Sequence, residues 1–262
     1  MRMDVLQAFA VCAYGNRFLQ DSTIDRPSEM RVQHSTFKTV IEVGFERKGI
    51  GANYGSEGVA PWLKRMRHEG VERLSILVAG CEPETKGQTA PWGILSDSER
   101  GLELWQPLWR KRMNTHPHDL TPWLVVYSGD RFNRWNLTPP APLEAAHTRI
   151  SSTLESLLMG CQRGNFSSQL KQPLTRCLEL HNQGDTQVMV TPDLCPPGFP
   201  PELQALVASA VRITVLAKSP LWTDCEVAPT VVQHEVGALW TSAMVALESV
   251  GHQSGYAERA AA

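Results

Sequence analysis

The chain has 262 residues, of which 42% are hydrophobic and 20% charged, and these values are typical of globular proteins and exclude a disordered or fibrous class. A chain of this length can bury about three quarters of the surface that it exposes when unfolded, so a sizeable core can form. The net charge of −2 argues against a dedicated nucleic-acid-binding protein, which usually has a strongly basic domain.

Five short runs of apolar residues predict the strands of a sheet. In chain order they cover residues 37–45, 74–79, 123–127, 187–191 and 212–217. Their apolar residues are nearly continuous, as expected for strands that are covered on both faces. Because the runs alternate with helical patterns, the sequence predicts an α/β fold with a mostly parallel sheet of about five strands and helices on both faces, layered as in Rossmann-like or flavodoxin-like proteins.

Helical periodicity covers much of the remaining chain. The predicted helices span residues 59–69, 98–113, 150–161, 165–181, 202–211 and 231–250. In the third of them Ile150, Leu154 and Leu157 follow one another at steps of three and four residues and form one apolar stripe. Pro107 lies inside the second and is expected to kink or interrupt it. Gly251 is well placed to end the last helix.

Three prolines, Pro139, Pro140 and Pro142, form the main internal punctuation of the chain. Such a cluster favours a loop over a domain linker. We therefore expect one α/β domain over residues 1–250, with a subdivision near residues 136–142 as the alternative, and a disordered tail over residues 251–262, whose apolar content is too low for packing.

The cysteines and the amino-terminal segment indicate the cellular compartment in which the protein is expected. No two cysteines form a CxxC pair, which is the spacing of zinc ribbons and thioredoxin-type redox centres. The first apolar run is short and is broken by Tyr14, Asn16 and Arg17, which makes a poor signal peptide, and no apolar stretch is long enough to cross a bilayer. We expect a cytoplasmic protein that has no membrane segment and whose cysteines are free and mostly buried.

The most distinctive local feature is the glycine-rich segment 49–58, between a predicted strand and a predicted helix. Glycines let backbone N–H groups approach a ligand, and a helix amino terminus favours an anion. The segment could hold a phosphate through Gly49, Gly51, Gly55 and Ser56. Its spacing matches neither the dinucleotide-binding fingerprint nor a P-loop, so a surface loop without a ligand is the alternative.

Polar residues follow each predicted strand, and parallel strands would bring them to one rim, where open α/β sheets bind ligands. They are Glu46, Arg47 and Lys48, then Cys81, Glu82 and Glu84, then Ser128, Asp130 and Arg131, then Asp193, and finally Lys218 and Ser219. Asp130, Glu82 and Lys218 are the candidate catalytic residues, and Arg131 is a candidate ligand-binding residue. The alternative is that these are ordinary polar loop residues, which any α/β sequence contains.

A thiol and a pair of imidazoles are further candidate sites. Cys81 is the one cysteine placed like a nucleophile, but the carboxylates of Glu82 and Glu84 would raise its pKa and disfavour the thiolate. His116 and His118 could share a divalent metal, because alternate residues of an extended segment face the same way. A third ligand is not evident, so we assign no metal site and no cofactor.

Tryptophans and basic residues cluster in two predicted helices. The clusters are Trp62, Arg65 and Arg67 in one helix and Trp105, Trp109, Arg110, Lys111 and Arg112 in the other. Basic side chains can neutralise phosphates while indole rings stack on bases, so these residues could form a nucleic-acid surface. Alternatively, Trp62, Leu63 and Met66 face the core, and the basic residues beside them form a solvated face.

Two hypotheses for the function follow. The first is that the protein binds a nucleotide-like or phosphorylated small molecule at the carboxyl edge of the sheet, with transferase or hydrolase activity as an option. The alternative is a nucleic-acid-binding or complex-forming subunit that uses the tryptophan and arginine clusters. Neither rests on a catalytic signature, so the sequence does not assign an enzymatic activity.

Overall fold

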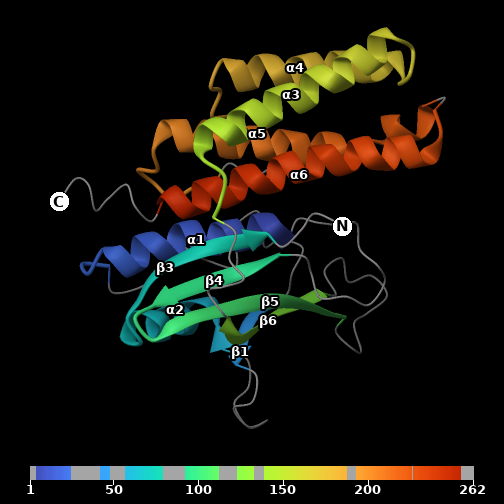
Figure 1. Cartoon of the computed structure of the whole chain (residues 1–262). Coiled ribbons are helices and arrows are strands. Elements are labelled where there is room, and N and C mark those ends of the chain that lie inside the picture. Colours follow the sequence, from blue (N-terminus) through green and yellow to red (C-terminus); the bar gives the residue numbers. More distant parts are fainter. Residues whose placement is uncertain are drawn as a thin grey trace.

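The computed structural model describes residues 4–24, 42–47, 57–78, 92–111, 123–132, 139–187, 193–225 and 227–254. The strands are β1 (Glu42–Arg47), β2 (Glu57–Gly58), β3 (Val71–Val78), β4 (Trp92–Ser98), β5 (Gly101–Lys111) and β6 (Trp123–Phe132). The helices α1 (Asp4–Gln20) and α2 (Val59–His68) pack on this sheet. A helical layer lies beyond α1 (Figure 1). It consists of α3 (Leu143–Gln162), α4 (Lys171–Asn182), α5 (Pro201–Ala217) and α6 (Pro229–Ser254), with two short 3-10 helices, η3 (Ser168–Leu170) and η4 (Pro220–Asp224).

The sheet is mixed. Its six strands stand in the order β2-β1-β6-β5-β4-β3. Among the described strands β1 and β6 form the parallel pair, and all other neighbours are antiparallel. The predicted mostly parallel sheet of about five strands is therefore wrong. Short apolar runs do not report strand direction, and β3 to β6 are successive strands, each of which pairs antiparallel with the next.

Helices α1 and α2 cover the same face of the sheet. Trp62 of α2 stacks on Phe45 of β1, with ring centroids 4.0 Å apart. Gly15 of α1 lies against Leu63 of α2 and Leu74 of β3. The two helices thus meet each other above the sheet and leave the Trp62 ring no exposed surface.

The β4–β5 hairpin occupies the segment that was predicted as a helix over residues 98–113. In β5 the apolar residues fall on both faces of the strand, so the sequence shows no period of two. Pro107 is tolerated because β4 pairs with β5 only from Gly101 to Trp105, whereas at Pro107 the strand has β6 as its partner. A missing N–H therefore costs no hydrogen bond toward β4.

Helix α1 was missed and the end of α5 was misread, because both helices are buried on nearly all sides. The predicted helix 202–211 is confirmed as part of α5. In α1 every residue from Val5 to Asn16 is buried, and in α5 the run 205–211 is buried throughout. A helix that is apolar all round loses the period that identifies it. The predicted strand 212–217 is consequently wrong and forms the end of α5, while most of the predicted strand 187–191 lies outside the described residues.

Helices with one apolar face were predicted correctly. The ranges 59–69, 150–161 and 231–250 correspond to α2, α3 and α6, and the range 165–181 corresponds to η3 followed by α4. In α3 the residues Ile150, Leu154 and Leu157 form the buried stripe. The predicted stop at Gly251 is wrong, because α6 continues to Ser254.

The edge strand β3 is covered by side chains from α1 and α6. The Asn16 amide donates to the carbonyl of Leu74 at 2.8 Å and accepts from its N–H at 2.7 Å. The N–H of Val78 donates to Glu248 Oε1 of α6 at 3.1 Å. These bonds satisfy backbone groups that would otherwise be open to another strand, and they tie the sheet to both helices.

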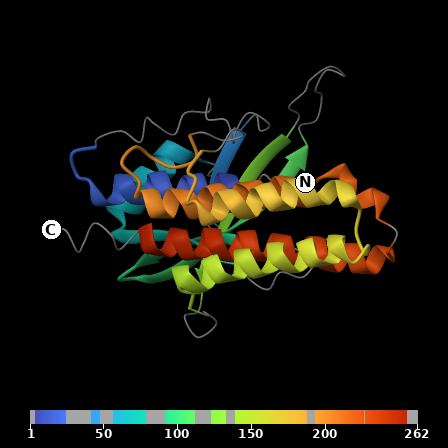
Figure 2. The same cartoon turned by 90° about the horizontal axis from the view of Figure 1, so that it is seen from above.

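In the helical layer α3 contacts α4 and α6, and α5 contacts the same two helices. Seen from above, these helices lie over α1 and the sheet (Figure 2). The apolar core includes residues of both layers. Among the described helices none combines the length and apolar character that a bilayer span requires.

Candidate ligand-binding cleft

The parallel pair β1 and β6 places two polar strand ends side by side. Arg47 at the end of β1 is in register with Gly129 of β6. Asp130 and Arg131 follow directly in β6, and both are exposed. Of the residues that were expected to share a rim, the structure thus brings together Glu46, Arg47, Ser128, Asp130 and Arg131.

Aromatic rings form the floor beneath this rim. Phe45 is stacked between Trp62 and Tyr127, with ring centroids at 4.0 and 4.9 Å. The Trp105 ring lies so close to Gly129 that a Cβ atom there would be 2.6 Å from the ring. Because Trp62 and Trp105 have no exposed surface, their faces cannot stack on the bases of a nucleic acid.

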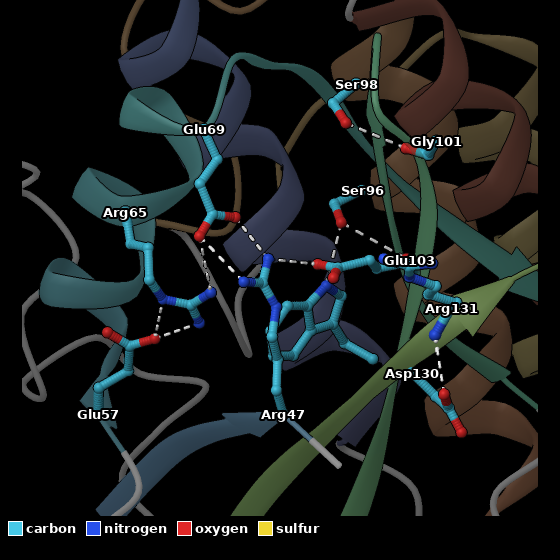
Figure 3. Close-up of polar contacts among 11 residues, drawn as sticks. Arg47, Glu57, Arg65, Glu69, Ser96, Ser98, Gly101, Glu103, Asp130 and Arg131 are labelled. Atoms are coloured by element: carbon cyan, nitrogen blue, oxygen red, sulfur yellow. Dashed lines mark hydrogen bonds and ion pairs between the residues drawn. The ribbon is translucent and has the colours of Figure 1, made fainter. Parts of the chain in front are cut away.

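Five charged side chains form an ion network above Trp105 (Figure 3). Arg47 makes a two-pronged contact with the Glu69 carboxylate, with Nη1 donating to Oε1 at 3.0 Å, and its Nη2 donates to Glu103 Oε2 at 2.8 Å. Arg65 donates through Nε to Glu57 Oε1 at 2.6 Å, and its Nη1 lies 3.5 Å from Glu69 Oε1. The two guanidinium carbons lie 5.9 and 5.5 Å from the Trp105 ring centroid.

Glu69 is the centre of this network. Partial burial raises the pKa of its carboxyl, but hydrogen bonds from Arg47, and the charges of Arg47 and Arg65, outweigh burial and hold that pKa below the ordinary value. The side chains of the network retain 20–28% of their exposure. Three carboxylates against two guanidinium groups leave the network with a formal charge of −1.

A cleft of about 1030 Å³ opens next to the network and shares Glu69 with it. Its walls come from the ends of α1 and α2, the start of β3 and the turn between β4 and β5. The ionisable residues that line it are Arg17, Asp21, His68, Glu69, Glu72, Glu99 and Arg100. Four of these residues are carboxylic acids and two are arginines, so the cleft is acidic.

Both helices that border the cleft end there. α1 ends at Gln20 and α2 at His68, and the carboxyl end of a helix carries partial negative charge. Arg67 of α2 links the two ends, since it donates to the carbonyls of Asp21 and Ile24 at 3.0 Å each. Hydrogen bonds from Thr23 lower the pKa of the Asp21 carboxyl, which keeps that wall of the cleft negatively charged.

The remaining predicted residues lie elsewhere or outside the described residues. Lys218 ends a helix instead of a strand, and its Nζ lies 5.5 Å from the Trp240 ring centroid. Arg65 and Arg67 make the internal contacts given above. Arg110 and Lys111 belong to β5, but their side chains are not described. Gly49, Gly51, Gly55, Ser56, Cys81, Glu82, Glu84, Arg112, His116 and His118 lie outside the described residues.

The sequence reasoning missed Glu57, Glu69 and Glu103. Arg47 is 22 positions from Glu69 and 56 positions from Glu103, so no local spacing connects them. The one available signal was Glu69 at the end of a predicted helix, where a carboxylate is unfavourable without a nearby cation. Among the described residues no group of three His, Cys, Asp or Glu side chains is arranged to hold a metal ion.

The chain matches no known protein family, no curated protein and no solved structure.

Proposed function

We propose that the protein binds a polar ligand with a cationic group, such as an amine or a guanidinium, in the cleft at the ends of α1 and α2. The observation that carries this proposal is that four carboxylic acids and two helix carboxyl ends border one opening. Charged hydrogen bonds from a cation to carboxylates are about twice as strong as neutral ones, so such a wall selects for positive charge.

The individual walls suggest how a ligand is oriented. Glu69 is already held by Arg47 and Arg65, so the cationic group of the ligand is expected to lie nearer Glu99, in the turn between β4 and β5. Arg100 follows Glu99 in the same turn and offers a place for an anionic group of the ligand. A molecule with separated positive and negative groups would match this lining.

Thermal unfolding in the presence of a ligand panel tests the proposal. Spermidine and arginine amide serve as cationic probes, and AMP and ATP as phosphorylated probes. We expect the cationic probes to raise the melting temperature saturably, because a ligand that prefers the folded state stabilises it. The double variant Glu72→Gln and Glu99→Gln should lose most of this rise.

A matched double variant controls for net charge. Glu144→Gln and Glu155→Gln remove two exposed carboxylates of α3 and should leave the response to the cationic probes intact. If neither cationic probe stabilises the protein, or if both double variants lose the response equally, the cleft is not the binding site that we propose.

A second candidate ligand is the nucleotide-like or phosphorylated small molecule, and Arg131 is the observation that favours it. Its side chain is exposed at the carboxyl ends of β1 and β6, where a guanidinium can bind phosphate in a two-pronged manner. In the same panel this candidate predicts stabilisation by AMP or ATP that is lost in Arg131→Gln. Stabilisation by the cationic probes alone would reject it.

A further inference from the structure

Two imidazole rings meet where α3 packs against α4. The ring centroids of His147 and His181 are 5.1 Å apart, and the ring planes are tilted by 35°. His181 is only 7% exposed, and His147 is half-buried. Water can therefore do little to stabilise a positive charge on the His181 ring, and it solvates the His147 ring only in part.

The hydrogen bonds of His181 can accept one proton without repacking. Its Nδ1 lies 2.9 Å from Ser209 Oγ, which in turn lies 3.0 Å from the carbonyl oxygen of Ala205. The backbone of His147 also hydrogen-bonds the His181 ring. A neutral ring accepts at Nδ1 from the Ser209 hydroxyl, whereas a protonated ring donates to it while Ser209 donates to Ala205. Rotation of one hydroxyl is the only change required.

A second proton is less favourable than the first, because the charged groups near the two rings are cationic. His181 faces His147 from α3 and Arg212 from α5, and Cys177 on α4 itself also faces Arg212. Asp185 is occupied by Arg212, which donates to its Oδ1 at 2.5 Å and to its carbonyl oxygen at 3.1 Å. Glu144, which lies one turn before His147 on α3, is exposed, and among the described residues no carboxylate is one of the groups that shift the pKa of either ring.

We propose that the His147–His181 pair makes the α3–α4 hairpin sensitive to acid. A proton on each ring places like charges 5.1 Å apart and loosens the packing of α3 and α4 on α6 and α5. Burial lowers the pKa of both rings below the ordinary value. The packing is therefore fully stable above that value and is weakened as the pH falls through the lowered values in the folded state.

Proton NMR of the histidine rings and hydrogen exchange of the whole chain test this proposal. In the unmodified protein two ring resonances should titrate below the ordinary histidine pKa and in separate steps, because the two sites are coupled. Between about pH 7.5 and about pH 5, the amides of α3 and α4 should lose protection relative to α1 after correction for the intrinsic exchange rate.

The variant His147→Gln removes the second charge and keeps a polar side chain of similar size. It should abolish most of the acid-induced loss of protection in α3 and α4. His234→Gln, which changes an exposed histidine of α6, is the matched control and should behave like the unmodified protein. Unaltered acid sensitivity in His147→Gln overturns the proposal. If that variant does not fold, titration of both rings of the unmodified protein at the ordinary value, in one step, overturns it equally.

Discussion

The ion network of the sheet layer and the histidine pair of the helical layer are both partly buried, and they differ in how charge is balanced. In the network, Arg47 and Arg65 stand among three carboxylates, so each cation has a partner. In the histidine pair, a positive charge on His181 faces the positive charges of a protonated His147 and of Arg212. The sheet layer should therefore keep its polar contacts down to the pH at which carboxylates are protonated, whereas the helical layer should change near the histidine range.

The two layers also differ in how freely their aromatic rings can move. Each has a glycine beneath a ring, namely Gly129 under Trp105 and Gly160 under Phe166. Trp105 is completely buried and donates to Ser96 Oγ at 3.0 Å. Phe166 follows the end of α3 and is 8% exposed. The same added methyl group should therefore be tolerated better in the helical layer.

Substitution of these glycines by alanine is expected to give the largest effect. Gly129→Ala forces a Cβ atom to within 2.6 Å of a fixed indole ring, and we expect a loss of about 3 kcal/mol of unfolding free energy, at the upper end for overpacked cores. Gly160→Ala brings a Cβ atom even closer to the Phe166 ring, but Phe166 lies in a bend outside the helices and can shift. The substitution also gains about 1 kcal/mol from helix propensity, so its net loss should be about 1 kcal/mol. Denaturant unfolding of both variants measures the difference, and equal losses would contradict the contrast between the layers.

Removal of the central carboxylate of the network is expected to give the second largest effect. Glu69→Gln leaves Arg47 and Arg65 with one carboxylate each, and we expect a loss of about 2 kcal/mol near neutral pH, between the values for exposed and buried ion pairs. Because the folded state lowers the pKa of Glu69, its contribution is present above the ordinary carboxyl pKa and is lost as the pH falls below it. Urea unfolding across pH tests this, with Glu155→Gln on the surface of α3 as a control that should show no comparable loss.

The sequence predicted the helices of the molecule better than its sheet, and the reason is burial. Helix α3 exposes one side to solvent, so the stripe of Ile150, Leu154 and Leu157 is visible in its sequence. α1 and α5 are enclosed and show no such stripe. In the sheet, β5 carries apolar residues on both faces and was read as a helix, and strand direction depended on turns that composition does not encode.

The predicted rim forms only where one strand pair is parallel, and the rim residues Arg47, Asp130 and Arg131 do not line the cleft. Arg47, Asp130 and Arg131 were expected to share a rim, and the pairing of β1 with β6 brings them together. Glu69 and Glu103 could not be predicted as partners of Arg47, because the contact joins positions far apart in the chain. Such charge compensation is a property of the tertiary structure.

At the junction between the two layers we expect a substitution that raises the unfolding free energy instead of lowering it. Glu248 of α6 accepts the Val78 N–H at 3.1 Å, and burial raises the pKa of its carboxyl from 4.5 to about 6. The folded state thus favours the protonated acid, and this stabilisation is complete below the unfolded pKa and is lost as the pH rises through about 6. Glu248→Gln keeps an acceptor oxygen, so we expect about 1 kcal/mol of added stability at about pH 7.5 and none at about pH 4. A variant that is less stable than the unmodified protein at about pH 7.5 would show that the carboxylate charge itself holds the layers together.

A surface ion pair of the helical layer is expected to contribute least to the unfolding free energy. Arg176 and Glu179 of α4 approach to 3.4 Å at i,i+3 spacing, but their side chains are 62% and 52% exposed. Water screens such a pair and ordering two long side chains opposes it, so Arg176→Gln should change the unfolding free energy by no more than a few tenths of a kcal/mol. Thermal unfolding in low and high salt measures the change. A loss as large as that of Glu69→Gln would mean that exposure does not distinguish the two pairs, and that α4 depends on its surface charges as strongly as the sheet depends on its ion network.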